Sequence, residues 1–344
     1  MQIDRAGGAL AKDGAWDGGL ALPLICAPMF FVSGVDLMIA CRTAGIVAGL
    51  PRHNYKDFEG FKVAVRQINQ AVDRYADAHP SAPIGPLAIN ISTALDEAEM
   101  RENLAFCHEQ GVELFISATG NPTDLIRRVH DQGGRILCDA VAIRFAEKAI
   151  EAGADGINAI GSGGGGHSGT LSHLALVSRV RAMFDGVIAM AGGLSDGASI
   201  RAARALGADM AYMGTRFIAT REAAAADAYK RMIVEGTAKD LIFTAALGGA
   251  PANWLRASLA QHGLDPENLP APPGGKFNHK SNYDHLPEGA RPWATIWSAG
   301  QGIDLIDDVP SVRELVDRLK REYEDHGSQA SAARIGRLLG RDAA

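Results

Sequence analysis

Short apolar runs alternate with longer amphipathic stretches along the first two thirds of the chain. Most of the short runs are continuously hydrophobic, which is typical of parallel strands that are buried on both faces. Eight runs are predicted as strands: Leu22–Phe30, Gly45–Leu50, Pro86–Ser92, Glu113–Ala118, Arg135–Val141, Gly156–Gly161, Gly186–Ala191 and Asp209–Gly214.

Helical patterns fill most of the gaps between these runs. Apolar residues recur at helical spacing over Asp57–Tyr75, which predicts an amphipathic helix. Two later helices end in the same Gly-Ala-Asp signal, at Gly153 and Gly207, where glycine can close the helix and a strand follows at once. The other predicted helices are Asp96–Gln110, Pro122–Asp131, Ala142–Ala152, Ser172–Phe184 and Ser195–Leu206.

Eight strand–helix units within about 220 residues predict a (β/α)8 TIM barrel. A doubly wound open sheet is the alternative, but its ligand signature comes early in the chain. Here the glycine-rich loops come late, after the sixth, seventh and eighth strands. We therefore predict an α/β fold, a TIM barrel with a small, mainly helical second lobe inserted after strand 8.

The pattern changes after Arg221. We predict a barrel over residues 1–220, a small lid or substrate lobe over 221–296, and a C-terminal segment over 297–344 that returns to the barrel. In this part the sequence predicts an Ala-rich helix over Glu222–Gly236, partly helical structure over Leu241–Leu269, a long loop over Pro270–Pro292 and a final helix over Val309–Tyr323.

Composition and net charge make some classes of protein function improbable. The chain has 344 residues, of which 47% are hydrophobic and 22% charged, as in ordinary globular proteins. A net charge of −6 without a long Lys/Arg cluster disfavours nucleic acid and anionic membrane as partners. No apolar run suits a signal peptide or a membrane span, so we expect a cytoplasmic enzyme. Four cysteines in apolar stretches are expected to be buried reduced thiols: Cys26, Cys41, Cys107 and Cys138.

The sixth strand ends in four consecutive glycines followed by His167. Such a loop can bring backbone N–H groups close to a planar or anionic ligand, because no Cβ intervenes. His167 would then stand at the mouth of the barrel, where barrel active sites lie. A formal dinucleotide-binding match at Gly161, Gly163 and Gly166 lacks the acidic residue that should end the next strand. His173 is a weaker candidate, and no metal-ligand cluster is evident, so we predict no metal site.

Two further loops offer free backbone amides at neighbouring strand ends. Gly192 and Gly193 end the seventh strand, and Gly214 and Thr215 end the eighth. A phosphate site after these two strands is a recurrent barrel feature; the alternative is a pair of tight turns without a ligand. Weaker candidates are the first strand end and two polar residues in apolar strands, whose partners could be ligand or backbone: Ala27, Pro28, Met29, Asn90 and Asp139.

Together these motifs resemble the nitronate monooxygenase family, formerly called 2-nitropropane dioxygenases. Its FMN-dependent TIM-barrel superfamily includes flavin enoyl-acyl-carrier-protein reductases and an NADH:quinone reductase. The resemblance runs from Pro23 to about Leu319. It rests on the segments Ala27–Met29, Asn90, Gly165–His167, Ala191–Gly193, Met213–Phe217 and Trp297–Gln301.

The resemblance implies FMN at the barrel mouth and His167 as the catalytic residue. It implies a phosphate site at the seventh and eighth strand ends, isoalloxazine contacts from the first and third strands, and Gln301 near the phosphate side. The implied cofactor-binding set is Ala27, Pro28, Met29, Asn90, Asp139, Gly165, Gly166, Ala191, Gly192, Gly193, Met213, Gly214, Thr215 and Gln301.

One departure from the family pattern concerns the catalytic loop. Many members have Gln-Gly-x-Glu-Ala-Gly-Gly-His, whereas here Ile160 and Gly163 replace the Gln and the Glu. Two polar groups near the flavin are therefore missing. This leaves the substrate open, while FMN binding can still rest on backbone amides.

The activity implied is FMN-dependent oxidation of alkyl nitronates with oxygen to a carbonyl compound and nitrite. The alternative is an NAD(P)H-dependent FMN reductase acting on an enoyl thioester or quinone; a third is a barrel that binds a phosphorylated ligand without redox chemistry. The unperturbed pKa of histidine, about 6.5, leaves two roles for His167. Protonated, it could hold the anion; neutral, it could take the α-proton of a nitroalkane. The partner would be a small nitronate or another small electron donor or acceptor, and a homodimer stays open.

Overall fold

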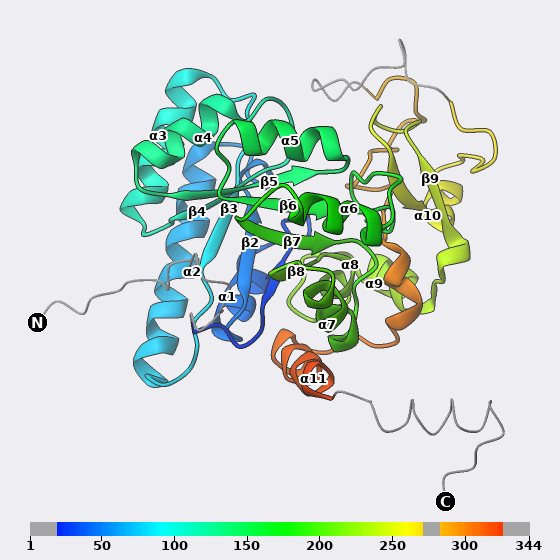
Figure 1. Ribbon diagram of the computed structural model, residues 1–344. Helices are drawn as coiled ribbons and strands as arrows, with labels where there is room; N and C mark the ends of the chain where they lie inside the picture. Colours follow the sequence, from blue (N-terminus) through cyan, green and yellow to red (C-terminus); the bar gives the residue numbers. More distant parts are fainter. Residues whose placement is uncertain (1–18, 271–282, 326–344) are drawn as a thin grey trace, which may run out of the picture.

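The computed structural model describes residues 19–270 and 283–325. Eight parallel strands form a closed barrel in chain order (Figure 1), and β8 pairs with β1 to close it. This confirms the predicted (β/α)8 barrel and excludes the open sheet. The strands are β1 Leu24–Cys26, β2 Val47–Pro51, β3 Leu87–Asn90, β4 Leu114–Ser117, β5 Arg135–Ala140, β6 Gly156–Ile160, β7 Val187–Ala191 and β8 Met210–Met213.

The strands are mostly apolar because both of their faces are buried. One cluster, which includes Ile25, Val47 and Leu137, fills the barrel interior. A larger cluster lies between the strands and the surrounding helices. Most strand positions therefore contact one core or the other, which explains why the sequence shows largely apolar runs.

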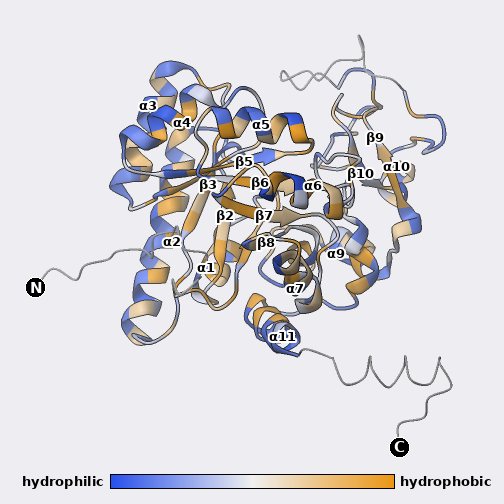
Figure 2. Ribbon diagram, viewed as in Figure 1, coloured by the Kyte–Doolittle hydropathy of each residue, from blue (hydrophilic) through white to orange (hydrophobic). Residues whose placement is uncertain are grey.

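The helices around the barrel turn apolar faces inward and polar faces outward (Figure 2). On α2, Phe61, Val65, Ile68 and Val72 are buried, and the Asp57 side chain accepts a hydrogen bond from the Gly60 N–H at the helix start. Helix α1 was not among the predicted elements. The helices are α1 Val35–Thr43, α2 Phe58–Ala78, α3 Glu97–Glu109, α4 Thr123–Asp131, α5 Ile143–Glu151, α6 His173–Arg181, α7 Gly197–Ala205 and α8 Thr215–Ile218.

Beyond β8 the structure departs from the prediction in detail. Helix α9 begins at Asp227, five residues later than predicted. The segment expected to be partly helical forms an antiparallel hairpin before a short helix, and these elements lie beside the barrel with their own apolar cluster around Trp254. The elements are α9 Asp227–Glu235, β9 Leu241–Thr244, β10 Ala252–Leu255, α10 Arg256–Gln261 and α11 Val312–Glu324, with short 3-10 turns at Arg52–Asn54, Ala238–Asp240 and Gln301–Leu305.

The final helix α11 confirms the last predicted element and packs against the barrel. A Cβ at Gly197 would lie 2.4 Å from the Leu319 carbonyl oxygen, so α7 and α11 need glycine at this crossing. Residues 271–282 of the predicted long loop and the tail after Asp325 lie outside the described residues. Among the helices that the structure describes, none is both long and apolar enough to span a membrane.

Candidate active site

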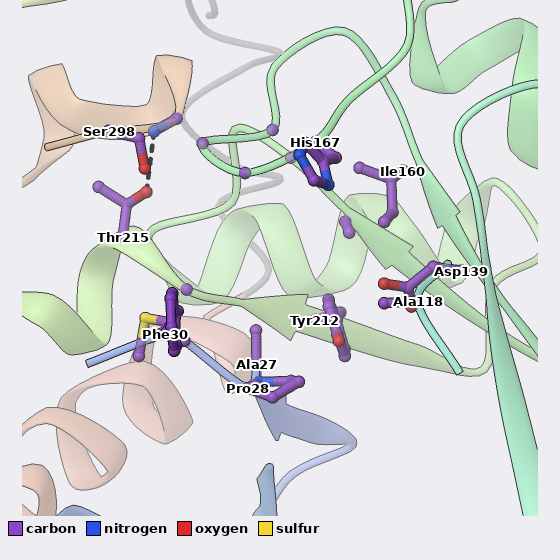
Figure 3. Close-up of a pocket in the computed structure, with 18 of the residues that line it drawn as sticks. Ala27, Pro28, Phe30, Ala118, Asp139, Ile160, His167, Tyr212, Thr215 and Ser298 are labelled. Atoms are coloured by element: carbon purple, nitrogen blue, oxygen red, sulfur yellow. Dashed lines mark hydrogen bonds between the residues drawn. The ribbon is translucent and has the colours of Figure 1, made fainter. Parts of the chain in front are cut away.

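A pocket of about 530 Å³ opens at the C-terminal ends of the barrel strands (Figure 3). This volume lies within the range of about 300–1,000 Å³ that is usual for ligand pockets. His167 and every predicted cofactor-binding residue except Gln301 line it. The late glycine-rich loops and the ends of β1, β3 and β5 therefore share one cavity.

Several glycines are needed where loops pack on one another. A Cβ at Gly192 would lie 2.8 Å from the Gly164 amide nitrogen, and a Cβ at Gly165 would lie 2.7 Å from that of Gly300. The Gly163 carbonyl accepts a hydrogen bond from the Gln301 N–H at 2.9 Å. The returning C-terminal segment is thus locked onto the loops after β6 and β7, and these glycines serve protein packing first.

Other glycines in the same loops face open space. A Cβ at Gly166 or Gly193 would meet no atom within 4 Å, although both residues line the pocket. Within the described residues, the N–H groups of Gly193, Gly214 and Thr215 donate no hydrogen bond. The Thr215 hydroxyl accepts one from the Gly300 N–H at 2.8 Å, drawn as a dashed line in Figure 3. Bare backbone with unused donors fits an anionic group such as a phosphate.

His167 lies between the barrel and the second lobe. Its backbone forms an isolated bridge with Ala252 on β10, and the next residue, Ser168, donates its N–H to the Pro251 carbonyl. The imidazole meets the Trp293 indole edge-on, with ring centroids 5.0 Å apart. Burial lowers the pKa of His167 to about 4. The imidazole is therefore uncharged at neutral pH.

The barrel end of the pocket carries a partly buried carboxyl group. Asp139 on β5 accepts a hydrogen bond from the Asn158 side-chain amide at 2.7 Å, and burial raises the pKa of Asp139 to about 7. Burial, and next the charge of Asp139, raise the pKa of Tyr212 well above its usual value. Asn90 donates its side-chain N–H to the Ile116 carbonyl at 3.2 Å. Backbone therefore supplies one partner of this amide.

Two sequence candidates do not line the pocket. The Gln301 side chain is exposed, although its neighbours Gly300 and Gly302 line the cavity. The His173 ring packs against Gly161 and hydrogen-bonds the Ala191 carbonyl at 2.8 Å. His173 thus supports the glycine loops from behind.

Several lining residues were not anticipated from the sequence. Tyr212 is a polar group in an apolar strand, the same signal that singled out Asn90. The others come from loops or from the second lobe and carry no local signal. The unanticipated aromatic and imidazole residues are Phe30, His53, Tyr212, Tyr229, Tyr283 and Trp293.

Comparison with solved structures supports the barrel as a whole. A point mutant of FabK from Thermotoga maritima is 25% identical, with a TM-score of 0.71, and the match covers 90% of this chain and 95% of that chain. A nitroalkane oxidase from Streptomyces ansochromogenes is 24% identical, with a TM-score of 0.70 over 92% of this chain and 98% of the other, and supports the fold alone.

Comparison with sequences identifies the family. A Mycobacterium tuberculosis protein named (3aS,4S,5R,7aS)-5-hydroxy-7a-methyl-1-oxo-octahydro-1H-indene-4-carboxyl-CoA dehydrogenase is 24% identical over 91% of this chain and 96% of its own length. A nitronate monooxygenase of Paraburkholderia phytofirmans is 32% identical, and the match spans 58% of either protein. Residues 61–322 match the sequence model of the family described as nitronate monooxygenase. The chain therefore belongs to the nitronate monooxygenase family of flavin enzymes and is an oxidoreductase.

Proposed function

We propose that the chain binds FMN in this pocket and oxidises alkyl nitronates with oxygen to a carbonyl compound and nitrite. The observation that carries the proposal is that His167 lines the same cavity as the bare-backbone cradle of Gly193, Gly214 and Thr215. Gly193, Gly214 and Thr215 would hold the phosphate, and Ala27–Met29 with Asn90 would lie beside the isoalloxazine. When bound, FMN supplies the redox chemistry.

The role of His167 follows from its uncharged state. Of the two roles that the sequence leaves open, the low pKa supports the neutral one. A neutral imidazole can accept the α-proton of a nitroalkane at one ring nitrogen. It can also donate a hydrogen bond from the other ring nitrogen to a nitronate oxygen.

A second candidate function is supported by the extent of one match. The CoA dehydrogenase match covers 96% of that protein, whereas the nitronate monooxygenase match covers 58% of its length. The second candidate is an NAD(P)H-dependent FMN reductase that acts on an enoyl thioester or a quinone; the name of the CoA dehydrogenase relative likewise points to a thioester. In that reaction, the neutral His167 would donate a hydrogen bond from its ring N–H to the carbonyl oxygen of the substrate.

We also propose the division into a barrel over 1–220, a substrate lobe over 221–296 and a returning segment over 297–344. Two observations support it. The hairpin region has its own apolar cluster, and Tyr283 and Trp293 from this lobe line the pocket. The returning segment contacts the glycine loops through Gly300 and Gln301.

The test separates the two functions by reductant. FMN-loaded protein is mixed without oxygen with ethyl nitronate, with NADH or with NADPH, and bleaching of the flavin absorbance is followed. We expect bleaching by the nitronate and, in air, release of nitrite. Fast bleaching by NADH or NADPH, with no nitrite from nitronate, would replace the first function by the second.

A further inference from the structure

Two parts of the chain give the pocket two kinds of wall. The barrel loops contribute mostly backbone and small side chains, such as Gly193 and Ala27, which suit a cofactor that lies close to the main chain. The second lobe contributes the aromatic rings of Tyr283 and Trp293. His167 contacts the Trp293 ring. The aromatic wall therefore lies on the side where the reactant meets the imidazole.

Trp293 is held in a backbone conformation that favours glycine. Its φ is +61°, in the left-handed region, which costs a non-glycine residue roughly 1–3 kcal/mol. Its N–H donates to the Ile296 carbonyl at 2.8 Å, and its ring packs on the fully buried Trp254 with centroids 4.8 Å apart. A glycine would adopt this turn without strain. The backbone conformation therefore does not explain the tryptophan, and its indole side chain does.

A second aromatic group lines the pocket away from His167 (Figure 3). Phe30 stacks on Phe31 with ring centroids 3.8 Å apart and lies beside His53 at 4.8 Å. Phe31 also has a φ of +61°, and its N–H donates to the Asn54 side chain at 2.9 Å. In the described chain, the two non-glycine residues with positive φ are therefore Trp293, which lines the pocket, and Phe31, which follows the lining residue Phe30.

The charges on the described lining disfavour a compact charged substituent. The described lining of the pocket contains neither Lys nor Arg. Burial lowers the pKa of His53 as it does that of His167. Asp139 is the carboxyl group of this lining, with Asn158 as its hydrogen-bonded neighbour. The part of the pocket near Trp293 therefore suits a flat apolar group.

We propose that Trp293 and Tyr283 bind a flat apolar substituent of the substrate, an aromatic or fused ring, next to His167, with Phe30 on the part of the pocket that lies away from His167. Aromatic rings pair in offset or edge-to-face geometry with centroids about 4.5–7 Å apart, as Trp293 already does with its neighbours. Resting on the proposed function, this makes aryl-substituted nitronates better substrates than short alkyl nitronates.

The kinetic test compares two nitronates in FMN-loaded protein. The kcat/KM for the nitronate of phenylnitromethane and for that of nitroethane is measured in the wild type, Trp293→Ala and Trp293→Phe. Phe243→Ala is the matched control, because Phe243 is a half-exposed aromatic residue of the same lobe that does not line the pocket. Trp293→Ala should lower kcat/KM about tenfold for the phenyl substrate and less than about threefold for the ethyl substrate. Trp293→Phe should keep most of the wild-type kcat/KM for the phenyl substrate.

A binding test does not depend on turnover. The affinities of benzamide and acetamide for the FMN-loaded protein are measured by calorimetry in the same four proteins. Benzamide should bind more tightly, and Trp293→Ala should remove that preference while Phe243→Ala keeps it. A benzamide preference without any nitrite formation would keep this inference and reject the proposed function. Equal losses for both ligands, or no effect of Trp293→Ala, would overturn the aromatic site.

Discussion

The Asp139 carboxyl group should make the native protein less stable as the pH rises. Burial moves its pKa from 3.8 to about 7. At 1.36 kcal/mol per pKa unit, this difference corresponds to about 4 kcal/mol. Asp139→Asn keeps a side-chain oxygen that can accept the Asn158 N–H and removes the titrating group. The variant should therefore be more stable than the wild type at neutral pH.

The sign and pH window follow from the raised pKa. Below pH 3.8 the carboxyl group is protonated in both native and unfolded chains, so it contributes no difference. Between this value and about pH 7, the unfolded chain releases the proton while the native protein keeps it, and native stability falls. The advantage of Asp139→Asn should grow from about 1.5 kcal/mol at pH 5 to about 4 kcal/mol at pH 8.

Urea denaturation at pH 5, 6, 7 and 8 measures this difference. The control is Asp185→Asn, which removes a carboxylate from the exposed surface and should change the unfolding free energy by less than about 0.5 kcal/mol. An Asp139→Asn advantage that does not grow with pH would refute the reasoning. So would a wild type that is more stable than this variant at pH 8.

Two other substitutions probe the glycine loops and the imidazole. Gly165→Ala should lower the unfolding free energy by roughly 1–3 kcal/mol, because its Cβ would collide with the returning backbone at Gly300; Gly166→Ala, which meets open space, should change it by less than about 0.5 kcal/mol in the same urea titration. His167→Ala should retain FMN and lose about 10²–10⁴-fold in nitronate turnover, measured as nitrite release. Equal effects of the two glycine variants, or an unchanged rate without His167, would contradict the respective argument.

The barrel could be predicted because its signal is local. Most strands are nearly continuous apolar runs that end in a turn, and both properties are visible in the sequence. Helix α1 was missed because Val35–Thr43 shows no clear polar face: beside the buried Leu37, Met38 and Cys41, the residues Val35, Ile39 and Ala40 are also apolar. The hairpin of β9 and β10 was missed because its strands are only four residues each and are defined by pairing with one another.

Part of the candidate site could likewise be predicted from the sequence, and part of it could not. Glycine loops at strand ends predicted the cradle and His167, because the barrel brings all strand ends to one rim. The aromatic wall could not be predicted, since Trp293 reaches His167 only through the packing of the second lobe on the barrel. Gln301 is expected near the phosphate; its side chain is exposed, and its backbone N–H donates to the Gly163 carbonyl. A contact made by the backbone does not depend on the residue type, so the sequence cannot indicate it.

The central claim is that bare backbone after β7 and β8 binds the phosphate of FMN. It is tested most directly by titrating the cofactor-free protein with FMN and with riboflavin, which lacks the phosphate, and following the quenching of flavin fluorescence. Hydrogen bonds to a charged group contribute about 1.5–3 kcal/mol each, so FMN should bind at least about 100-fold more tightly than riboflavin. Equal affinity for the two flavins, or no binding of FMN, would contradict the claim.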